Sequence, residues 1–279
     1  MKYNRVILVG SGWGAIAAYK GLVRGKLPIW VISEDLSLKT TKQTIPKDEL
    51  SRLTNELIIF SGHKPIVKEP VISANKCINI HYSLLPAYRG LHSTVWAILN
   101  NEPQLGLTIH EMNEFIDDGP IIFQKAFDND GISTSADYIN VFNQYITDNI
   151  SKIIQAYLSG EIKAKPQDKL AASWVGKRNL NDCKLDFTTK IEYLKLFFRA
   201  LVDPYPKPFF EYHGRRISIE KPQFHPSTIM THCGRILNID NEGIWIKVSD
   251  GYLVTNRMHD ESGNIVLPSH FRIGAFVNQ

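Results

Sequence analysis

An amide and an imidazole stand two positions apart in the segment KCINIHYS (residues 76–83), which predicts a β-strand. Side chains alternate along a strand, so Asn79 and His81 are expected to point to the same side. Ligands of open α/β sheets bind beyond the carboxyl ends of the strands. Further along, Asp117 and Asp118 precede Gly119 in a turn before the next strand. These side chains are the candidates for a reactive centre.

An amide, an imidazole and a carboxylate together suit acyl transfer to an amine. The Asn79 amide can donate a hydrogen bond to an oxyanion that develops on a tetrahedral carbon. His81 can exchange protons with the attacking and the leaving nitrogen. A nearby carboxylate is expected to orient the imidazole and to raise its pKa. Ser83 lies close in sequence, but no G-x-S-x-G elbow surrounds it, so direct transfer without an acyl-enzyme is favoured.

The first part of the chain alternates between strand-like and helix-like segments. RVILVG (5–10) and ELIIFSG (56–62) predict buried strands, and GWGAIAAYKGLVRG (12–25) predicts a helix between strands. Further helices are expected over PKDELSRLTN (46–55) and, with an apolar spacing of three and four, over 133–160. This alternation predicts an α/β fold with a Rossmann-like, doubly wound, mostly parallel sheet.

The sequence changes character in its last third. The segment 191–206 predicts one more helix, which Pro204 and Pro206 end. Short alternating segments follow, with NEG and SDG turns that are typical of hairpins. We therefore expect a catalytic domain at 1–185, a connecting helix and hairpin at 186–225, and a small C-terminal β-domain at 226–279.

A glycine turn near the start offers an alternative function. VGSGWGA fits the G-x-G-x-x-G/A pattern of dinucleotide-binding turns, and the acids Glu34 and Asp35 follow about 20 residues later, where a ribose partner would lie. An NAD-dependent oxidoreductase is therefore a distant alternative.

Composition excludes several other classes of protein. The 279 residues are 43% hydrophobic and 22% charged, as is ordinary for a globular protein, and no apolar run reaches the ~18 residues of a membrane helix. Three distant cysteines and no signal-peptide pattern indicate a cytoplasmic location. The histidines and cysteines form no metal-binding spacing, so no metal is expected. The net charge is only +4 and the basic residues are scattered, which argues against nucleic acid as a partner.

NIHYSLLPAYRG (79–90), followed by IDDGPII (116–122), resembles the folate-dependent formyltransferases. Their pattern is N-x-H-x-S-L-L-P-x-Y-R-G and then D-x-G-x-I. The resemblance implies that Asn79, His81 and Asp117 are catalytic, because the family places its acid two residues before the glycine. It implies N10-formyltetrahydrofolate as formyl donor, and it explains the glycine turn without NAD. The residues expected to contact the folate are Ser83, Leu84, Leu85, Pro86 and Asp118.

The acceptor is the point on which members of this family differ. GRILNIDNEGIWIKVSDGYLV (234–254) is similar to the C-terminal β-domain of methionyl-tRNA formyltransferases and of several sugar N-formyltransferases. The tRNA enzymes usually begin with F-x-G-T-P and carry R-G-x-x-P, whereas this chain has LVGSGWG and RGLHST. We therefore expect a nucleotide-linked 3- or 4-amino-deoxysugar, with dTDP as the expected nucleotide, as in O-antigen synthesis. A methionyl-tRNA formyltransferase-like enzyme is the alternative.

Several residues are candidates for binding the acceptor. They are Trp13, Arg89, His92, Thr94, Trp96, Tyr205, Lys207 and Phe209. For some of them a structural role is an equal or better interpretation: Trp13 can pack on a helix, Arg89 can clamp a loop, and the aromatic residues after Pro204 can belong to a core. A non-catalytic folate-binding or nucleotide-sugar-binding module also stays open. Relatives are often dimers, so a homodimer is a further possibility.

Overall fold

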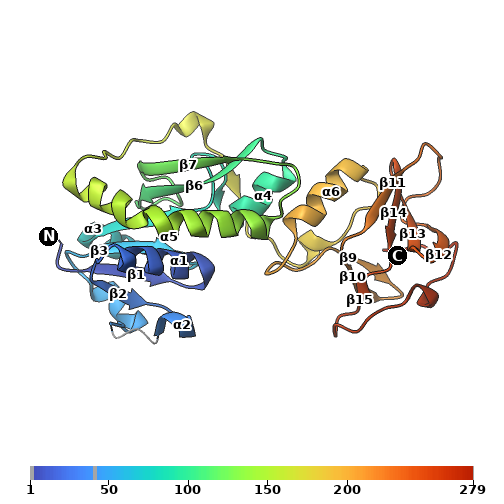
Figure 1. The fold of residues 1–279 in the computed structure, drawn as a ribbon, viewed down its shortest axis with the longest axis horizontal. Helices are drawn as coiled ribbons and strands as arrows, with labels where there is room; N and C mark the ends of the chain where they lie inside the picture. Colours follow the sequence, from blue (N-terminus) through green and yellow to red (C-terminus); the bar gives the residue numbers. More distant parts are fainter. Residues whose placement is uncertain (1–2, 40–42, 279) are drawn as a thin grey trace. The chain divides into compact units, whose positions relative to one another are not determined.

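A computed structural model describes residues 3–39 and 43–278, and these fall into two compact units (Figure 1). The first unit comprises residues up to 97, 103–130 and 137–177, and the second comprises 98–102, 131–136 and the chain from 178 onward. Within the described part of the chain, no helix is both long and apolar enough to cross a membrane.

A six-stranded sheet forms the centre of the first unit, and it confirms the predicted α/β fold. Its strands are, in spatial order, β2 (Ile29–Ile32), β1 (Val6–Gly10), β3 (Leu57–Ser61), β4 (Lys76–His81), β6 (Gln104–Glu111) and β7 (Ile121–Asp128). The first four strands run parallel, whereas β6 is antiparallel to β4 and β7 is antiparallel to β6. The sheet is therefore mostly parallel, with an antiparallel edge beside the strand that carries Asn79 and His81.

Helices cover both faces of this sheet. They are α1 (Gly12–Arg24), α2 (Leu36–Lys39), α3 (Glu69–Ala74), α4 (Ser93–Leu99) and α5 (Ser135–Ser159). On one face, Ile7 and Val9 of β1 join an apolar cluster that includes Val71 of α3. Side chains alternate along a strand, so the buried Leu8 faces the other side. There α1 contacts β1 and β3 and packs closely on α5, since a Cβ on Gly21 would lie 2.5 Å from Ile150 (Figure 1).

Residues 46–55 depart from the predicted helix. The structure has a 3₁₀ helix over Lys47–Arg52 instead of an α-helix. None of these six residues is buried, and Pro46 before them provides no side-chain cap. A segment this short gains too little from hydrogen bonds alone to form a longer α-helix.

The glycine turn after β1 has a packing role that can be tested. Gly10 has φ +151°, and a Cβ built on it would lie 1.8 Å from the backbone oxygen of Ser61. Gly10→Ala is therefore expected to destabilise the protein by roughly 1–3 kcal/mol, as overpacking against backbone usually does. Urea unfolding measures this difference. Gly176→Ala is the matched control, because nothing lies within 4 Å of its added Cβ; equal stability of the two variants would contradict the packing role.

The main elements of the second unit, among its described residues, are an α-helix and two antiparallel sheets. Helix α6 spans Ile191–Ala200. The sheets have the orders β15-β10-β9 and β11-β14-β13-β12. Their strands are β9 (Phe209–Tyr212), β10 (Arg215–Ile219), β11 (Gln223–Pro226), β12 (Ile236–Asp240), β13 (Gly243–Val248), β14 (Gly251–Thr255) and β15 (Met258–His259). The NEG and SDG turns close the hairpins β12–β13 and β13–β14, as predicted.

Candidate active site

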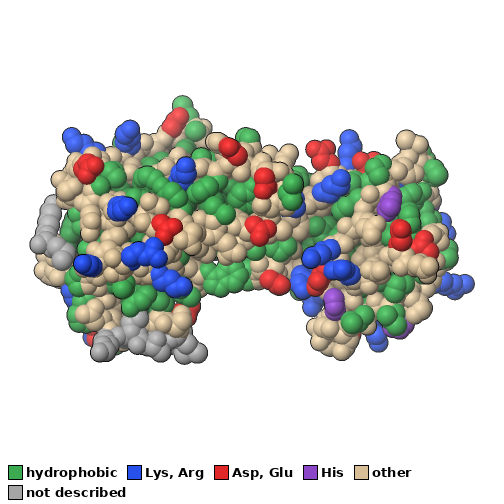
Figure 2. Space-filling model, in the orientation of Figure 1, with side chains coloured by type: hydrophobic (Ala, Val, Ile, Leu, Met, Phe, Trp, Pro, Cys, Tyr) green, Lys and Arg blue, Asp and Glu red, His purple; other side chains and the backbone are tan. Residues whose placement is uncertain are grey.

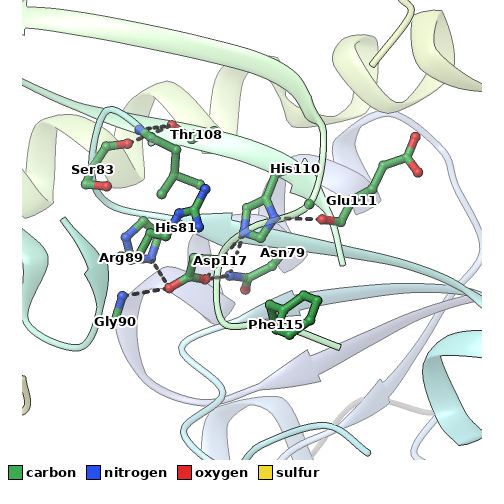
Figure 3. Close-up of polar contacts among 12 residues, drawn as sticks. Asn79, His81, Ser83, Arg89, Gly90, Thr108, His110, Glu111, Phe115 and Asp117 are labelled. Carbon is green, nitrogen blue, oxygen red and sulfur yellow. Dashed lines mark hydrogen bonds and ion pairs between the residues drawn. The ribbon is translucent and has the colours of Figure 1, made fainter. Parts of the chain in front are cut away.

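The end of β4 and the loop after β6 bring Asn79, His81 and Asp117 together (Figure 3). Asn79 Nδ2 donates to Asp117 Oδ1 at 3.2 Å, and His81 Nδ1 lies 3.5 Å from Asp117 Oδ2. The three residues that the sequence singled out therefore share one centre, with the carboxylate between the amide and the imidazole. Each of them is buried or half-buried in the first unit.

Asp117 adopts an uncommon backbone conformation to reach this position. Its φ is +50°, a region that aspartate tolerates better than most residues. The backbone N–H of Gly90 donates to Asp117 Oδ2 at 2.9 Å. Gly119 completes the turn, because a Cβ there would lie 1.8 Å from the backbone oxygen of Glu111. The turn thus fixes the direction of the carboxylate before any ligand arrives.

A second histidine, which the sequence analysis did not single out, belongs to the same cluster. His110 on β6 is the register partner of Asn79 on β4. Its Nδ1 lies 2.7 Å from the carbonyl oxygen of Glu111, so Nδ1 must carry a hydrogen. When His110 is neutral, its Nε2 then accepts from Asn79 Nδ2 at 3.2 Å. Both amide hydrogens of Asn79 are engaged in this arrangement, so an oxyanion must compete with His110 or Asp117 for one of them.

The sequence predicted a raised pKa for His81, and the structure indicates a lowered one. Burial lowers it, and the neighbouring His110 lowers it further, while Asp117 and the Tyr88 carbonyl raise it; the net shift is downward from 6.5. Asp117 therefore raises the pKa of His81 as expected, but burial lowers this pKa by more, so His81 is neutral near pH 7. Its Nε2 lies 2.9 Å from the Tyr88 carbonyl oxygen and so carries the hydrogen. The bare Nδ1 then faces Asp117, which will stabilise a proton taken up there.

Asp117 stays ionised beside these two histidines. Burial alone would raise its pKa, but the charge of His81, the hydrogen bond and charge of His110, and the Gly90 N–H together hold the pKa well below 3.8. The centre at neutral pH is thus a neutral imidazole next to a carboxylate. This pairing can accept a proton from a weakly acidic group and hold it.

Hydrogen bonds to side chains of β6 and β7 hold the loop that follows β4. Thr108 Oγ1 donates to the Ser83 carbonyl at 2.7 Å and accepts from the Leu85 N–H at 3.2 Å. Gln124 Nε2 donates to the Leu85 carbonyl at 2.8 Å. The Ser83 hydroxyl is bonded to the Ala87 carbonyl at 2.8 Å, and the Leu85–Pro86 peptide is cis. The backbone shape of this loop is therefore set by β6 and β7 behind it.

Two protein-family models match this chain. Residues 20–153 match the family model "Formyl transferase", and residues 178–275 match "Formyl transferase, C-terminal domain". The chain belongs to the folate-dependent formyltransferases. As a formyltransferase it uses N10-formyltetrahydrofolate as the formyl donor.

This formyltransferase is similar to several known proteins. It is 25% identical over 255 residues to a methionyl-tRNA formyltransferase of Desulfotalea psychrophila, covering 89% of this chain and 79% of the relative. Its fold matches HypX of Aquifex aeolicus in complex with tetrahydrofolic acid (TM-score 0.66, 17% identity), with 92% of this chain and 44% of HypX covered, so the chain spans less than half of HypX. It also matches an N-formyltransferase of Helicobacter canadensis in complex with folinic acid and dTDP-3-aminofucose (TM-score 0.66, 20% identity), covering 90% and 98%.

Several residues of the formyltransferase that were predicted to bind the donor or the acceptor contact other parts of the chain. Arg89 is 4% exposed and its Nη1 forms an ion pair with Asp118 Oδ1 at 2.6 Å, which supports the clamp interpretation. Thr94 is buried and its hydroxyl donates to the Tyr82 carbonyl at 3.1 Å. Trp96 Nε1 donates to the Gly176 carbonyl at 2.8 Å. Binding of a substrate by these residues stays a prediction.

The remaining candidates for binding the acceptor differ in exposure, backbone conformation and contacts. Trp13 is half exposed at the glycine turn, and His92 has φ +62°. Phe209 is buried in β9, and Lys207 forms an ion pair with Glu220 at 2.5 Å. Tyr205, Lys207 and Phe209 lie in the second unit, whereas the remaining candidates lie in the first. In the described part of the chain, no three His, Cys, Asp or Glu side chains are grouped to hold a metal ion.

Proposed function

We propose that this formyltransferase transfers formyl directly to a primary amine at the centre formed by Asn79, His81 and Asp117. The observation that carries the proposal is the neutral His81, whose bare Nδ1 faces the ionised Asp117. A carbonyl oxygen that gains charge needs a donor, and the Asn79 amide can supply one by exchanging its hydrogen bond to Asp117. The side chain of Phe115, two residues before Asp117, is exposed and gives a flat apolar surface that suits the rings of the folate (Figure 3).

In the proposed reaction the bound donor supplies a formyl carbon attached to nitrogen N10. A bond forms between the amine nitrogen and this carbon, and the bond between the carbon and N10 breaks. His81 takes the proton that the amine loses and passes it to the leaving nitrogen, so no proton is gained or lost overall. Asp117 stabilises the imidazolium while the proton is held. Asn79 donates to the oxygen, and its hydrogen bond to His110 keeps the amide oriented beforehand.

Methionyl-tRNA is the acceptor that the sequence relatives support. Methionyl-tRNA formyltransferases of Desulfotalea psychrophila and other bacteria match this chain at 25–28% identity and over most of their own length. Sequence analysis favoured the amino sugar, and these relatives favour its alternative. A tRNA acceptor would also contradict the expectation of no nucleic-acid partner.

A nucleotide-linked amino sugar is the second candidate, because several features of the chain do not suit tRNA. The sequence departs from the F-x-G-T-P and R-G-x-x-P patterns of the tRNA enzymes. On the face drawn in Figure 2, Lys and Arg lie among Asp and Glu and form no continuous basic stripe. The fold neighbour from Helicobacter canadensis was solved with an amino sugar bound to dTDP and covers 90% of this chain.

A direct comparison of acceptors tests the proposal. Purified enzyme and N10-formyltetrahydrofolate are incubated in parallel with charged initiator methionyl-tRNA and with dTDP- and UDP-linked 3- and 4-amino-deoxysugars, and tetrahydrofolate release is measured. The acceptor with the largest kcat/KM identifies the substrate class. If it is tRNA, binding should weaken steeply with salt, because counterions are released from the phosphates. Turnover with none of the amines would refute formyl transfer to this class of acceptor.

A further inference from the structure

Residues 165–176, which we call the clasp, follow α5 and lie outside both matched family regions, 20–153 and 178–275. One end of the clasp is bonded to the start of β7: Lys165 and Ile121 exchange backbone hydrogen bonds of 2.7 and 2.9 Å. At the other end, β8 (Trp174–Val175) pairs in parallel with β5 (Arg89–Gly90). The clasp is thus fastened to the two loops that carry the reactive centre.

Gln167, two residues after Lys165, holds the backbone of the catalytic turn. Its Nε2 donates to the carbonyl oxygens of Asp117 at 2.7 Å and of Gly119 at 2.8 Å. Its Oε1 accepts from Arg89 Nη2 at 2.7 Å, while Arg89 Nη1 binds Asp118. The Gln167 side chain therefore links the turn at 117–119 to the buried guanidinium of Arg89. These bonds hold the left-handed backbone of Asp117 from the carbonyl side, whereas Asn79 and Gly90 hold its carboxylate.

Ser173 acts on the opposite side of the imidazole. Its hydroxyl accepts from the backbone N–H of Tyr88 at 2.9 Å, and its backbone N–H donates to the Pro86 carbonyl at 3.2 Å. Tyr88 has φ +60°, and its carbonyl oxygen is the neighbour of His81 Nε2. The two ring nitrogens of His81 thus face Asp117 and Tyr88, and the clasp holds each of these residues from behind.

We propose that the clasp positions both neighbours of His81 and that Gln167 is a positioning residue for formyl transfer. The inference rests on formyl transfer at this centre and is independent of which amine accepts the group. Gln167 touches no reacting atom, so its effect must pass through the direction of Asp117. Small displacements of a reacting or supporting group can lower a rate by about 100-fold, whereas binding of the donor elsewhere is little affected.

The test compares Gln167→Leu, Gln167→Glu and the control Gln144→Leu, which removes an exposed glutamine of α5 whose amide donates to Asp148. We expect Gln167→Leu to lower kcat by about 10- to 100-fold with little change in the KM for the donor. Gln167→Glu keeps the acceptor for Arg89 but loses both donors, so it should lose nearly as much. Gln144→Leu should behave as the wild type.

A second readout needs no activity. Amide hydrogen exchange followed by mass spectrometry should become faster at Gly90 and at residues 117–119 in Gln167→Leu, and unchanged there in Gln144→Leu. Wild-type kcat and unchanged exchange in Gln167→Leu would overturn the proposal, as would wild-type kcat in Gln167→Glu. If the wild type itself transfers no formyl group, the proposed function fails, and the exchange measurement still decides whether the clasp fixes the turn.

Discussion

Replacing His81 by asparagine is expected to lower kcat by about 100- to 10,000-fold, the usual range for loss of a general acid–base group. Asparagine has no nitrogen that can take up and release a proton near pH 7. It keeps a polar side chain in a site that is only 8% exposed, although it lacks the two outer ring atoms of histidine. Single-turnover formyl transfer with both substrates saturating measures the chemical step directly.

The fold of the His81→Asn variant must be shown to be intact. Its melting temperature and its affinity for a folate analogue should stay close to those of the wild type. His270→Asn, which changes an exposed histidine of the second unit, serves as the matched control and should keep full activity. A His81→Asn variant that retains most of its kcat would remove the imidazole from the mechanism.

The pH profile gives a further test of His81. His81 accepts a proton only when it is neutral, and burial places its pKa below 6.5. We therefore expect kcat to fall on the acid side as His81 becomes protonated, with the midpoint of this fall below pH 6.5. Stopped assays from pH 5 to 8 measure this limb. An acid limb centred above 6.5 would show that Asp117 outweighs burial, against the environment that the structure gives.

The sequence was sufficient to predict that Asn79, His81 and Asp117 lie at one centre. Asp117 was preferred over Asp118 because of the resemblance to the formyltransferases, whereas Asn79 and His81 lie on one strand, where the period of two fixes their direction. Local patterns of this kind carry the geometry with them. The alternation of apolar strands and amphipathic helices predicted the doubly wound sheet in the same way.

His110 and Gln167 could not be found in this way. His110 meets Asn79 only because β6 pairs antiparallel with β4 in one register, and pairing between strands is not local in sequence. A polar histidine within the apolar strand LGLTIHEM was the one available signal. Gln167 lies in an irregular segment 50 residues after Asp117, where no periodicity predicts direction. The direction of the His81 pKa shift was also missed, because it depends on burial in three dimensions.

The Asp117→Asn variant is expected to lose both activity and stability. Asparagine tolerates the left-handed φ of this position as well as aspartate does, so the backbone is not the cause. The carboxylate accepts from Asn79 Nδ2 on one oxygen and from the Gly90 N–H on the other. Whichever way the new amide turns, its NH₂ group meets one of these donors. A buried donor left without an acceptor costs about 1–3 kcal/mol of unfolding free energy.

The stability difference between wild type and Asp117→Asn should depend on pH in a defined direction. The folded-state pKa of Asp117 lies below 3.8, so its contribution is complete above 3.8 and is lost as pH falls toward the folded-state pKa. In urea unfolding, the difference should be at least as large at pH 5 as at pH 7, because Asp117 also stabilises a proton on His81, and it should narrow below pH 4. A stability difference that widens below pH 4 would contradict the low folded-state pKa of Asp117.

The activity of Asp117→Asn decides between two roles of the carboxylate. If Asp117 stabilises the proton on His81, kcat should fall by about 100-fold or more. The acid limb of kcat should also move to lower pH, because Asp117 raises the pKa of His81 and asparagine does not. Comparing both enzymes with one acceptor cancels the titration of the amine itself. A variant that loses kcat with an unmoved acid limb would indicate that Asp117 only holds Asn79 and Gly90 in place.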